Sequence, residues 1–468
     1  MQINLCSFRL FVFLHYLCTH EINIIQFLFK NQMTSLTLPI VVAFVIGYFF
    51  IAVESVTKIN KAAIALLMCV VCWTMFTVMG LPEVFHIELG EAIEKNLGEA
   101  GTTLFFLMGA MTIVEIVDQH GGFNWVRGAL KSKTKRALLW KIAFMTAILS
   151  AVLDNLTTSI VMIMILRKLV ADKKDRIWFT SLVIIAANAG GAFSPIGDVT
   201  TIMLWNGKMI TAAGVITEII IPSFIAFIVP AAVLQIHLKG ELKVPEDKRE
   251  AEISYITQME RKLIFILGVG GLCSVPVFHS LTELPPFMGI LLVLAVLWTV
   301  TEIIYRRKEE HDPMAKRVSN LLSRIDMSTI LFFLGILMAV AVLSEVGVLR
   351  ALGKWLDQEI SNHYLVTGAI GILSSIVDNV PLVAGAMKMY EMGAAGTDFG
   401  VDGVFWQLLA YCAGVGGSML IIGSAAGVVV MGLEKITFGW YMRNVTWIAF
   451  VGYLAGIVSY WALRTFVF

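Results

Sequence analysis

The chain has few charged residues and few cysteines for its length. Only 15% of its 468 residues are charged, whereas about one quarter is usual in soluble proteins. Together with a hydrophobic fraction of 58%, this shortage excludes an ordinary soluble domain. The six cysteines lie mostly inside apolar runs, which excludes the disulfide framework of a secreted domain. Lys and Arg total 35 against 34 Asp and Glu, so the charge balance gives no reason to expect nucleic acid as a partner.

Motifs of enzymes and of ATP-driven pumps are also missing. The sequence has no P-loop, no dinucleotide-binding fingerprint and no nucleophile elbow. No acid, base and nucleophile fall together at one motif, and no Cys/His cluster suggests a soft transition metal. We therefore expect neither an enzyme nor a bound cofactor.

Apolar runs of the length that spans a bilayer recur along the whole chain, which predicts an all-α polytopic membrane protein in contact with lipid. Ten crossings are predicted, and residues 5–29 would add an eleventh. Residues 1–32 are interpreted either as that extra helix or as an over-extended gene start. The ten predicted spans are 36–54, 62–81, 101–118, 177–205, 212–236, 262–279, 285–304, 327–346, 404–431 and 443–467.

Basic residues predict the orientation of these spans. Nearly all of them fall in four connections, which the positive-inside rule places in the cytoplasm, whereas the alternate connections, such as 82–100, contain little Lys or Arg and face outward. The cytoplasmic connections are 119–141, 167–176, 237–262 and 305–324.

Two further apolar stretches are each interrupted by an Asp-Asn pair, which predicts a pair of helices rather than one span. The stretch 137–170 lies between two cytoplasmic connections, so it must enter and leave on the inside. By the same reasoning, 363–390 enters and leaves on the outside. We expect two opposed re-entrant hairpins.

The two halves of the sequence match each other at an offset of 224 to 227 residues. Because the matching spans cross in opposite directions, the matches predict inverted-topology repeats, 33–240 with the inner hairpin and 241–468 with the outer one. The matches are residues 104–107 with 331–334, 148–155 with 372–379, and Gly190, Gly191 and Gly197 with Gly416, Gly417 and Gly423.

Each repeat contains a predicted helix break. In the first, Pro195 and Gly197 interrupt an apolar run directly before Asp198. Irregular backbone at membrane depth is tolerated only where it is buried in protein or lines a watery cavity, and transporters use such breaks to hold their substrate. Close helix packing at Gly190 and Gly191 is the alternative explanation for the glycines alone.

Three aspartates lie in these apolar surroundings: Asp154 and Asp378 at the hairpin tips and Asp198 at the first break. A carboxylate near the bilayer centre is costly and therefore a candidate for function. For Asp378, an N-cap of the second hairpin helix is the alternative role. The predicted neighbours that supply oxygen ligands are Asn155, Thr157, Thr158, Asn188, Ser194, Thr200, Thr201, Asn379, Ser418 and Ser424.

Such oxygens suit a hard cation, so we predict a Na⁺ or Li⁺ site at Asp154 and Asp198. Burial disfavours a charged carboxylate while a bound cation favours it, so proton and cation compete for one group. This competition couples opposite fluxes if only the loaded carrier reorients. Glu115 and Ser150 are candidate proton relays, and Glu115 is equally compatible with a polar seam between helices.

Three segments, 153–158, 188–201 and 377–382, closely resemble those of the NhaD-type sodium/proton antiporters of the ion transporter superfamily. The resemblance covers roughly residues 36–468. It implies extrusion of Na⁺ and Li⁺ in exchange for protons, a role in pH homeostasis, an inner (plasma) membrane and, because superfamily members pair, a homodimer.

The alternative is a sodium-coupled dicarboxylate or other organic anion symporter of the same architecture. Superfamily members that carry dicarboxylates typically bear Ser-Asn-Thr at their hairpin tips, where this chain has Asp154 and Asp378. An added negative charge should repel an anion. The site segments also contain no Lys or Arg, so the sequence favours cation exchange.

Overall fold

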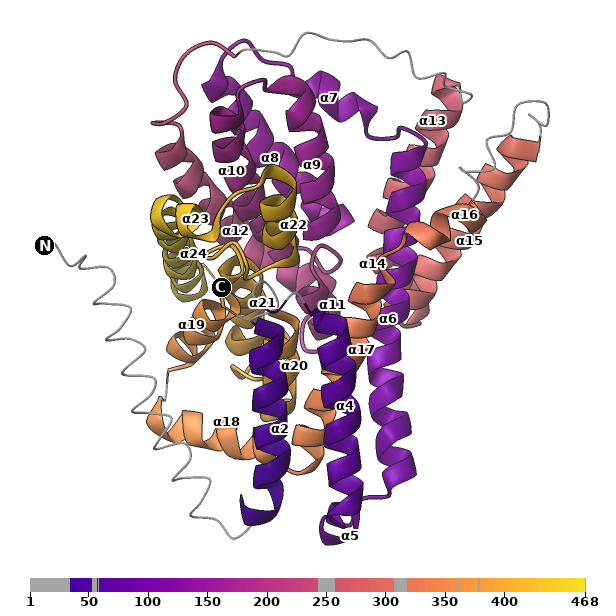
Figure 1. Cartoon of the computed structure of the whole chain (residues 1–468), viewed down its shortest axis with the longest axis vertical. Coiled ribbons are helices and arrows are strands. Elements are labelled where there is room, and N and C mark those ends of the chain that lie inside the picture. Colours follow the sequence, from indigo (N-terminus) through magenta and orange to yellow (C-terminus); the bar gives the residue numbers. More distant parts are fainter. Residues whose placement is uncertain are drawn as a thin grey trace, which may run out of the picture.

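The computed structural model describes residues 34–52, 57, 59–242, 257–306, 318–360, 362–376 and 379–467 (Figure 1). These residues form helices and the turns between them, which confirms the all-α class. Within these ranges, the pairing of Thr134 with Glu241 is the single isolated β-bridge. The predicted N-terminal segment and Asp378 lie outside the described residues.

The predicted first repeat, residues 33–240, spans the helices up to α12. Their bounds are α2 Thr34–Ala52, α4 Lys61–Val78, α5 Leu81–Val84, α6 Leu89–Gln119, α7 Asn124–Leu130, α8 Lys135–Leu153, α9 Asn155–Leu169, α10 Lys173–Ala192, α11 Val199–Asn206 and α12 Ala212–Leu234.

The predicted second repeat, residues 241–468, spans the remaining helices. Its elements are α13 Gln258–Phe265, the π-helical turn η1 Ile266–Gly270, α14 Gly271–Thr282, α15 Pro286–Arg306, α16 Val318–Leu321, the 3₁₀ turn η4 Leu322–Arg324, α17 Met327–Glu345, α18 Val348–Glu359, α19 His363–Ser374, α20 Asn379–Met389, α21 Val404–Gly416, α22 Ala425–Glu434, α23 Phe438–Asn444 and α24 Thr446–Phe466.

Eight helices within the described ranges are long and apolar enough to cross a membrane. Seven coincide with predicted crossings, and the eighth is α8, which begins the predicted inner hairpin. The other three predicted crossings are α2, whose apolar part is shorter, and the two broken helices. The chain is therefore a multi-pass membrane protein.

One predicted boundary is wrong. Helix α6 begins at Leu89 rather than near residue 101. Most of the connection 82–100, which is predicted to face outward, is therefore helical. Glu91, Glu94 and Glu99 lie on this first part of α6. The sequence indicated only the apolar part of the helix, because a helix that extends beyond the bilayer exposes polar residues there.

Both predicted helix breaks are present. Helix α10 ends at Ala192 and α11 begins at Val199, while α21 ends at Gly416 and α22 begins at Ala425. The glycines allow close packing at equivalent places: a Cβ on Gly190 would collide with the backbone of Ala147, and one on Gly416 with the backbone of Gly371. Helix α8 thus packs against α10 as α19 packs against α21.

The helix pairs predicted around the two Asp-Asn sequences connect the two halves of the chain. Helices α8 and α9 are separated by the single residue Asp154. The second helix of each pair packs against the helix that follows the break in the other half of the chain. Helix α9 contacts α22, and α20 contacts α11 (Figure 1).

Three of the basic connections meet at one end of the molecule. Leu242 N donates to Lys133 O at 3.0 Å, and Lys135 forms an ion pair of 2.7 Å with Asp175. These contacts place parts of 119–141, 167–176 and 237–262 together, as expected if all three share one side of the membrane.

Candidate functional site

Asp198 is the buried carboxylate at the break between α10 and α11. Its side chain is the N-cap of α11: Oδ1 accepts hydrogen bonds from both N and Oγ1 of Thr200, each of 3.1 Å. Thr201 closes the same turn, since its Oγ1 donates to Asp198 O at 2.8 Å. Only 2% of Asp198 is exposed, and both threonines are fully buried.

Two asparagine amides from other helices approach this carboxylate. Asn155 Nδ2, at the start of α9, donates to Asp198 Oδ2 at 2.8 Å. Asn379 Nδ2, at the start of α20, lies 3.4 Å from Oδ1 and 3.5 Å from Oδ2. This carboxylate of the first half of the chain is therefore contacted by an amide from each half.

Asn188 extends this set to the second helix break. Its Oδ1 accepts from Asn155 Nδ2 at 3.1 Å, and its own Nδ2 donates to Ser424 Oγ at 3.0 Å. Ser424 is the N-cap of α22, with Gly427 N donating to its Oγ at 3.2 Å. Ser424 is thus the N-cap residue after the second helix break, as Asp198 is after the first.

Four helices begin at this cluster: α9, α11, α20 and α22. The N-terminus of a helix carries unpaired N–H groups and a partial positive charge, which favours an ionised carboxylate. We call this arrangement, formed by Asn155, Asn188, Asp198, Asn379 and Ser424, the four-helix junction.

Asp154 lies beside the four-helix junction and caps α9. Its Oδ1 accepts from Thr157 N and its Oδ2 from Thr157 Oγ1, both at 2.8 Å. Its backbone has φ 79° and ψ 161°, a combination that is essentially restricted to glycine and costs about 1–3 kcal/mol in other residues. Strain of this kind gathers at functional sites, and here it directs the half-buried side chain of Asp154 toward the start of α9.

The remaining predicted ligands have mostly backbone partners. Ser194 Oγ donates to Ala151 O at 2.5 Å, and Ser418 Oγ donates to Val415 O at 2.6 Å. Thr158 Oγ1 is buried and has no hydrogen-bond partner within the described residues, so it is available to a ligand at the start of α9. Asp378 precedes α20 but lies outside the described residues, so its predicted role stays a prediction.

The two candidate relay residues are in helices that pack near the four-helix junction. Ser150 Oγ donates to Ala187 O at 2.6 Å, and the equivalent Ser374 Oγ donates to Ala413 O at 2.7 Å. This repeated bond ties α8 to α10 and α19 to α21. Glu115, in α6, accepts a 3.0 Å hydrogen bond from Gln119 one turn later.

Sequence reasoning missed two features of the helices that begin at the junction. A cavity of about 550 Å³ lies where α11 and α20 end, and it is lined by residues that include Glu99, Asn206 and Lys388. Glu434, at the end of α22, is buried between Arg167 and Arg176. The sequence offered one signal for Glu434, an acidic residue closing an apolar run, but no way to locate its partners.

Comparison with known proteins agrees with this architecture. A model of the citrate transporter family matches residues 48–406. Sodium/proton antiporter 1 of Arabidopsis thaliana is 45% identical over 91% of this chain and 72% of its own length. The Na⁺/H⁺ antiporter NhaD of Vibrio cholerae is 29% identical over 90% of each chain.

A solved structure is similar in fold. The YdaH transporter of Alcanivorax borkumensis has a TM-score of 0.52 and 12% identity, with 81% of this chain and 88% of that chain covered. From the family match, the chain belongs to the citrate transporter family, which is one of transporters rather than enzymes. Its relatives include NhaD-type sodium/proton antiporters, which confirms the resemblance inferred from the motifs.

Proposed function

We propose that this protein is a secondary Na⁺/H⁺ antiporter that also accepts Li⁺. The observation that carries the proposal is Asp198, a carboxylate that is 2% exposed, lies at a helix break and is surrounded by amide and hydroxyl groups of both repeats. The names of its antiporter relatives support the same activity.

Cation binding would require a small rearrangement of the four-helix junction. The amide nitrogen of Asn155 now faces Asp198, but rotation of the amide would present its Oδ1 to a cation instead. Asp198, Asp154, Asn155, Asn379 and nearby hydroxyl groups would then replace part of the hydration shell of Na⁺ or Li⁺.

Proton coupling follows from the burial of Asp198. A buried carboxylate is charged when a cation neutralises it and otherwise gains from binding a proton. If only the neutralised forms reorient across the membrane, each cation leaving must be matched by protons entering. The Thr200 and Asn155 groups would serve both forms, since they can donate to the carboxylate or accept from it.

The architecture supplies a route for reorientation. We propose that α8 with α9 and α19 with α20 are the two opposed re-entrant hairpins of inverted repeats 33–240 and 241–468. Transporters of this design alternate access by moving one part of the fold against another. We further propose that the protein forms a homodimer in an energised inner membrane.

Symport of citrate or another organic anion is the second candidate, favoured by the name of the matching family. Four helix N-termini at the four-helix junction would suit an anion. However, Asp198 and Asp154 already cap α11 and α9 with the chain's own carboxylates. A free anion at the same place would meet like charge, so the structure favours the antiporter.

The test uses everted membrane vesicles with a respiration-driven pH gradient. Addition of Na⁺ or Li⁺ should dissipate the gradient, whereas K⁺ and potassium citrate should not. Asp198→Asn should be inactive, while Asp326→Asn, which alters an exposed aspartate that caps α17 through Thr329, should resemble the wild type. Absence of any cation effect from neutral to alkaline pH, together with Na⁺-dependent uptake of labelled citrate, would establish the symporter instead.

A further inference from the structure

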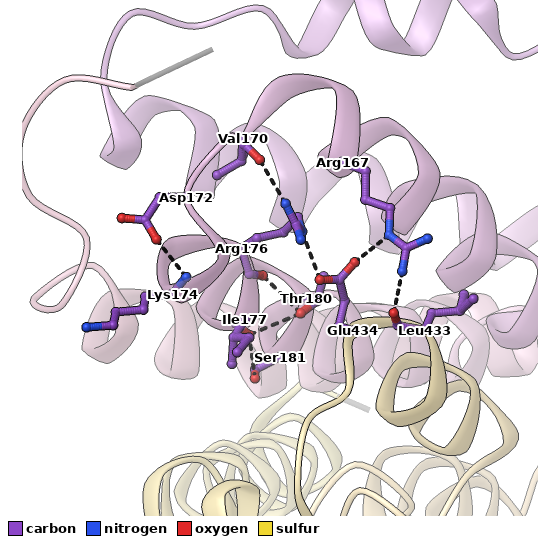
Figure 2. A network of polar contacts seen from close by, with 10 residues as sticks. All are labelled: Arg167, Val170, Asp172, Lys174, Arg176, Ile177, Thr180, Ser181, Leu433 and Glu434. Atoms are coloured by element: carbon purple, nitrogen blue, oxygen red, sulfur yellow. Dashed lines mark hydrogen bonds and ion pairs between the residues drawn. The ribbon is translucent and has the colours of Figure 1, made fainter. Parts of the chain in front are cut away.

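A buried ion cluster lies at the far end of α9 and α22 (Figure 2). The carboxylate of Glu434 accepts from Arg167 Nε at 2.7 Å and from Arg176 Nε at 2.8 Å. The Glu434 side chain is 1% exposed, against 17% for Arg176 and 42% for Arg167. Figure 2 shows the two guanidinium groups converging on the carboxylate from the first repeat, with Glu434 reaching them from the second.

Each arginine also binds a backbone carbonyl. Arg167 donates from its terminal nitrogen to Leu433 O, and Arg176 Nη1 donates to Val170 O at 3.1 Å. Both carbonyls lie at helix ends, where C=O groups lack partners within the helix. The cluster therefore supplies hydrogen-bond donors for carbonyl groups at the ends of α9 and α22, and it joins both helices to the start of α10.

The position of Glu434 is unfavourable without these partners. It is the last residue of α22, where the partial negative charge of the helix dipole opposes an acidic side chain. A buried charge is also costly unless it is paired and hydrogen-bonded. Two arginines offset both effects, and the planar guanidinium group suits bonds to carboxylate and carbonyl oxygen together.

Helices α9 and α22 connect this cluster to the four-helix junction. They contact each other, and each begins at the junction and ends at the cluster. At the junction end they are linked by Asn188, which bonds both Asn155 and Ser424. At a rise of about 1.5 Å per residue the two attachment points lie roughly 15–18 Å apart.

We infer that Glu434 is a positioning residue for the cation site. Bound by Arg167 and Arg176, it fixes the position of α22 along α9. That position in turn sets the spacing of Ser424, Asn188 and Asn155 beside Asp198. This inference rests on the proposed function. Glu434, at the end of α22, would then affect cation affinity although it does not touch the cation.

The test compares two buried glutamates. Glu434→Gln should raise the Na⁺ concentration for half-maximal exchange about tenfold, which is within the range of effects that changes along a packed network have on a distant site, and should leave the maximal rate nearly unchanged. Glu218→Gln is the matched control, because Glu218 is also buried and pairs with Arg464 at 2.7 Å, but on α12 and α24, outside the four-helix junction. Its half-maximal Na⁺ concentration should equal that of the wild type.

A purely structural role predicts a different result. Glu434→Gln would then lower the thermal unfolding temperature as Glu218→Gln does, with wild-type Na⁺ dependence, and the inference would be wrong. If Glu434→Gln does not fold, Arg167→Gln provides the measurement, because Arg176 still pairs with Glu434; it should raise the half-maximal Na⁺ concentration about threefold, and an unchanged value would overturn the inference.

The result is distinguishable from failure of the proposed function. The stabilisation of purified wild-type protein by added Na⁺ is measured alongside exchange. Wild-type protein that neither exchanges Na⁺ nor is stabilised by it contradicts the antiporter proposal itself. Wild-type protein that does both, with a Glu434→Gln variant of equal Na⁺ response, contradicts only the positioning role.

Discussion

Asn155 Nδ2 donates a hydrogen bond of 2.8 Å to Asp198 Oδ2, which ties the start of α9 to the break between α10 and α11. The exposed fractions of the two residues are 9% and 2%. Because the same amide also bonds Asn188, its orientation affects the link to Ser424 and the second repeat. A change at Asn155 should therefore alter cation binding without removing the negative charge of Asp198.

We expect Asn155→Ala to raise the half-maximal Na⁺ concentration about tenfold, since a ligand of the cation and a partner of Asp198 are both lost. Vesicle assays at constant pH measure this value. Asn444→Ala is the control, because the Asn444 amide bonds only its own helix end through Trp440 O among the described contacts. Wild-type Na⁺ dependence in Asn155→Ala would show that the amide is not a ligand.

Proton and cation compete for the same carboxylate in the proposed mechanism. In the pH range where the carboxylate is mostly protonated, each unit decrease in pH should raise the half-maximal Na⁺ concentration about tenfold. The maximal rate at saturating Na⁺ should change much less. Measurements with the same pH on both sides of the membrane test this, and a half-maximal concentration that is independent of pH argues for separate sites.

The strained backbone of Asp154 allows the effects of this residue on stability and on transport to be measured separately. Asp154→Gly should unfold at a higher temperature than Asp154→Ala, because both variants lose the bonds to Thr157 and only glycine adopts φ 79° without the strain of about 1–3 kcal/mol that other residues carry. Asp154→Ala keeps the strain and loses the bonds to Thr157, so it should unfold at a lower temperature than the wild type. Both variants should lose Na⁺/H⁺ exchange. Full activity in the glycine variant would restrict Asp154 to a capping role.

Close helix packing at the breaks makes a fourth prediction. Gly190→Ala or Gly416→Ala should destabilise the protein by about 1–3 kcal/mol, since the new methyl group meets backbone atoms that have little freedom to move. Gly101→Ala is the control: it lies in helix α6 with open space around it, and alanine favours helix by about 1 kcal/mol. Unfolding in detergent solution measures all three, and equal stability would contradict the packing argument.

Much of this arrangement could be predicted from periodicity and charge. Apolar runs located most crossings, and Pro195 with Gly197 located the first break because both residues disfavour a continuous helix. The repeat located the second break, which contains no proline. The residue types at the site were also predictable, since polar side chains in apolar surroundings are costly and need partners.

Other features could not be predicted because they depend on distant contacts. The polar first part of α6 has no apolar periodicity, so the start of the helix predicted from the sequence lies too far along the chain. The bond of Asn188 to Ser424 joins residues 236 positions apart, and that of Asn379 to Asp198 spans 181. Arg167 and Arg176 were interpreted as part of a basic connection, because nothing local indicates that Glu434 lies between them.

The contacts of α9 with α22 and of α20 with α11 bear on how the protein is made. Asp198 is synthesised 181 residues before Asn379, which corresponds to roughly 10–40 s at usual elongation rates of about 5–20 residues per second. During that interval Asp198 has only its partners from the first half of the chain, which include Asn155 and Thr200, because the Asn379 amide does not yet exist. A buried carboxylate with fewer hydrogen-bond donors binds a proton more readily, so the group that is expected to release protons in the finished protein is expected to bind one first during its biogenesis.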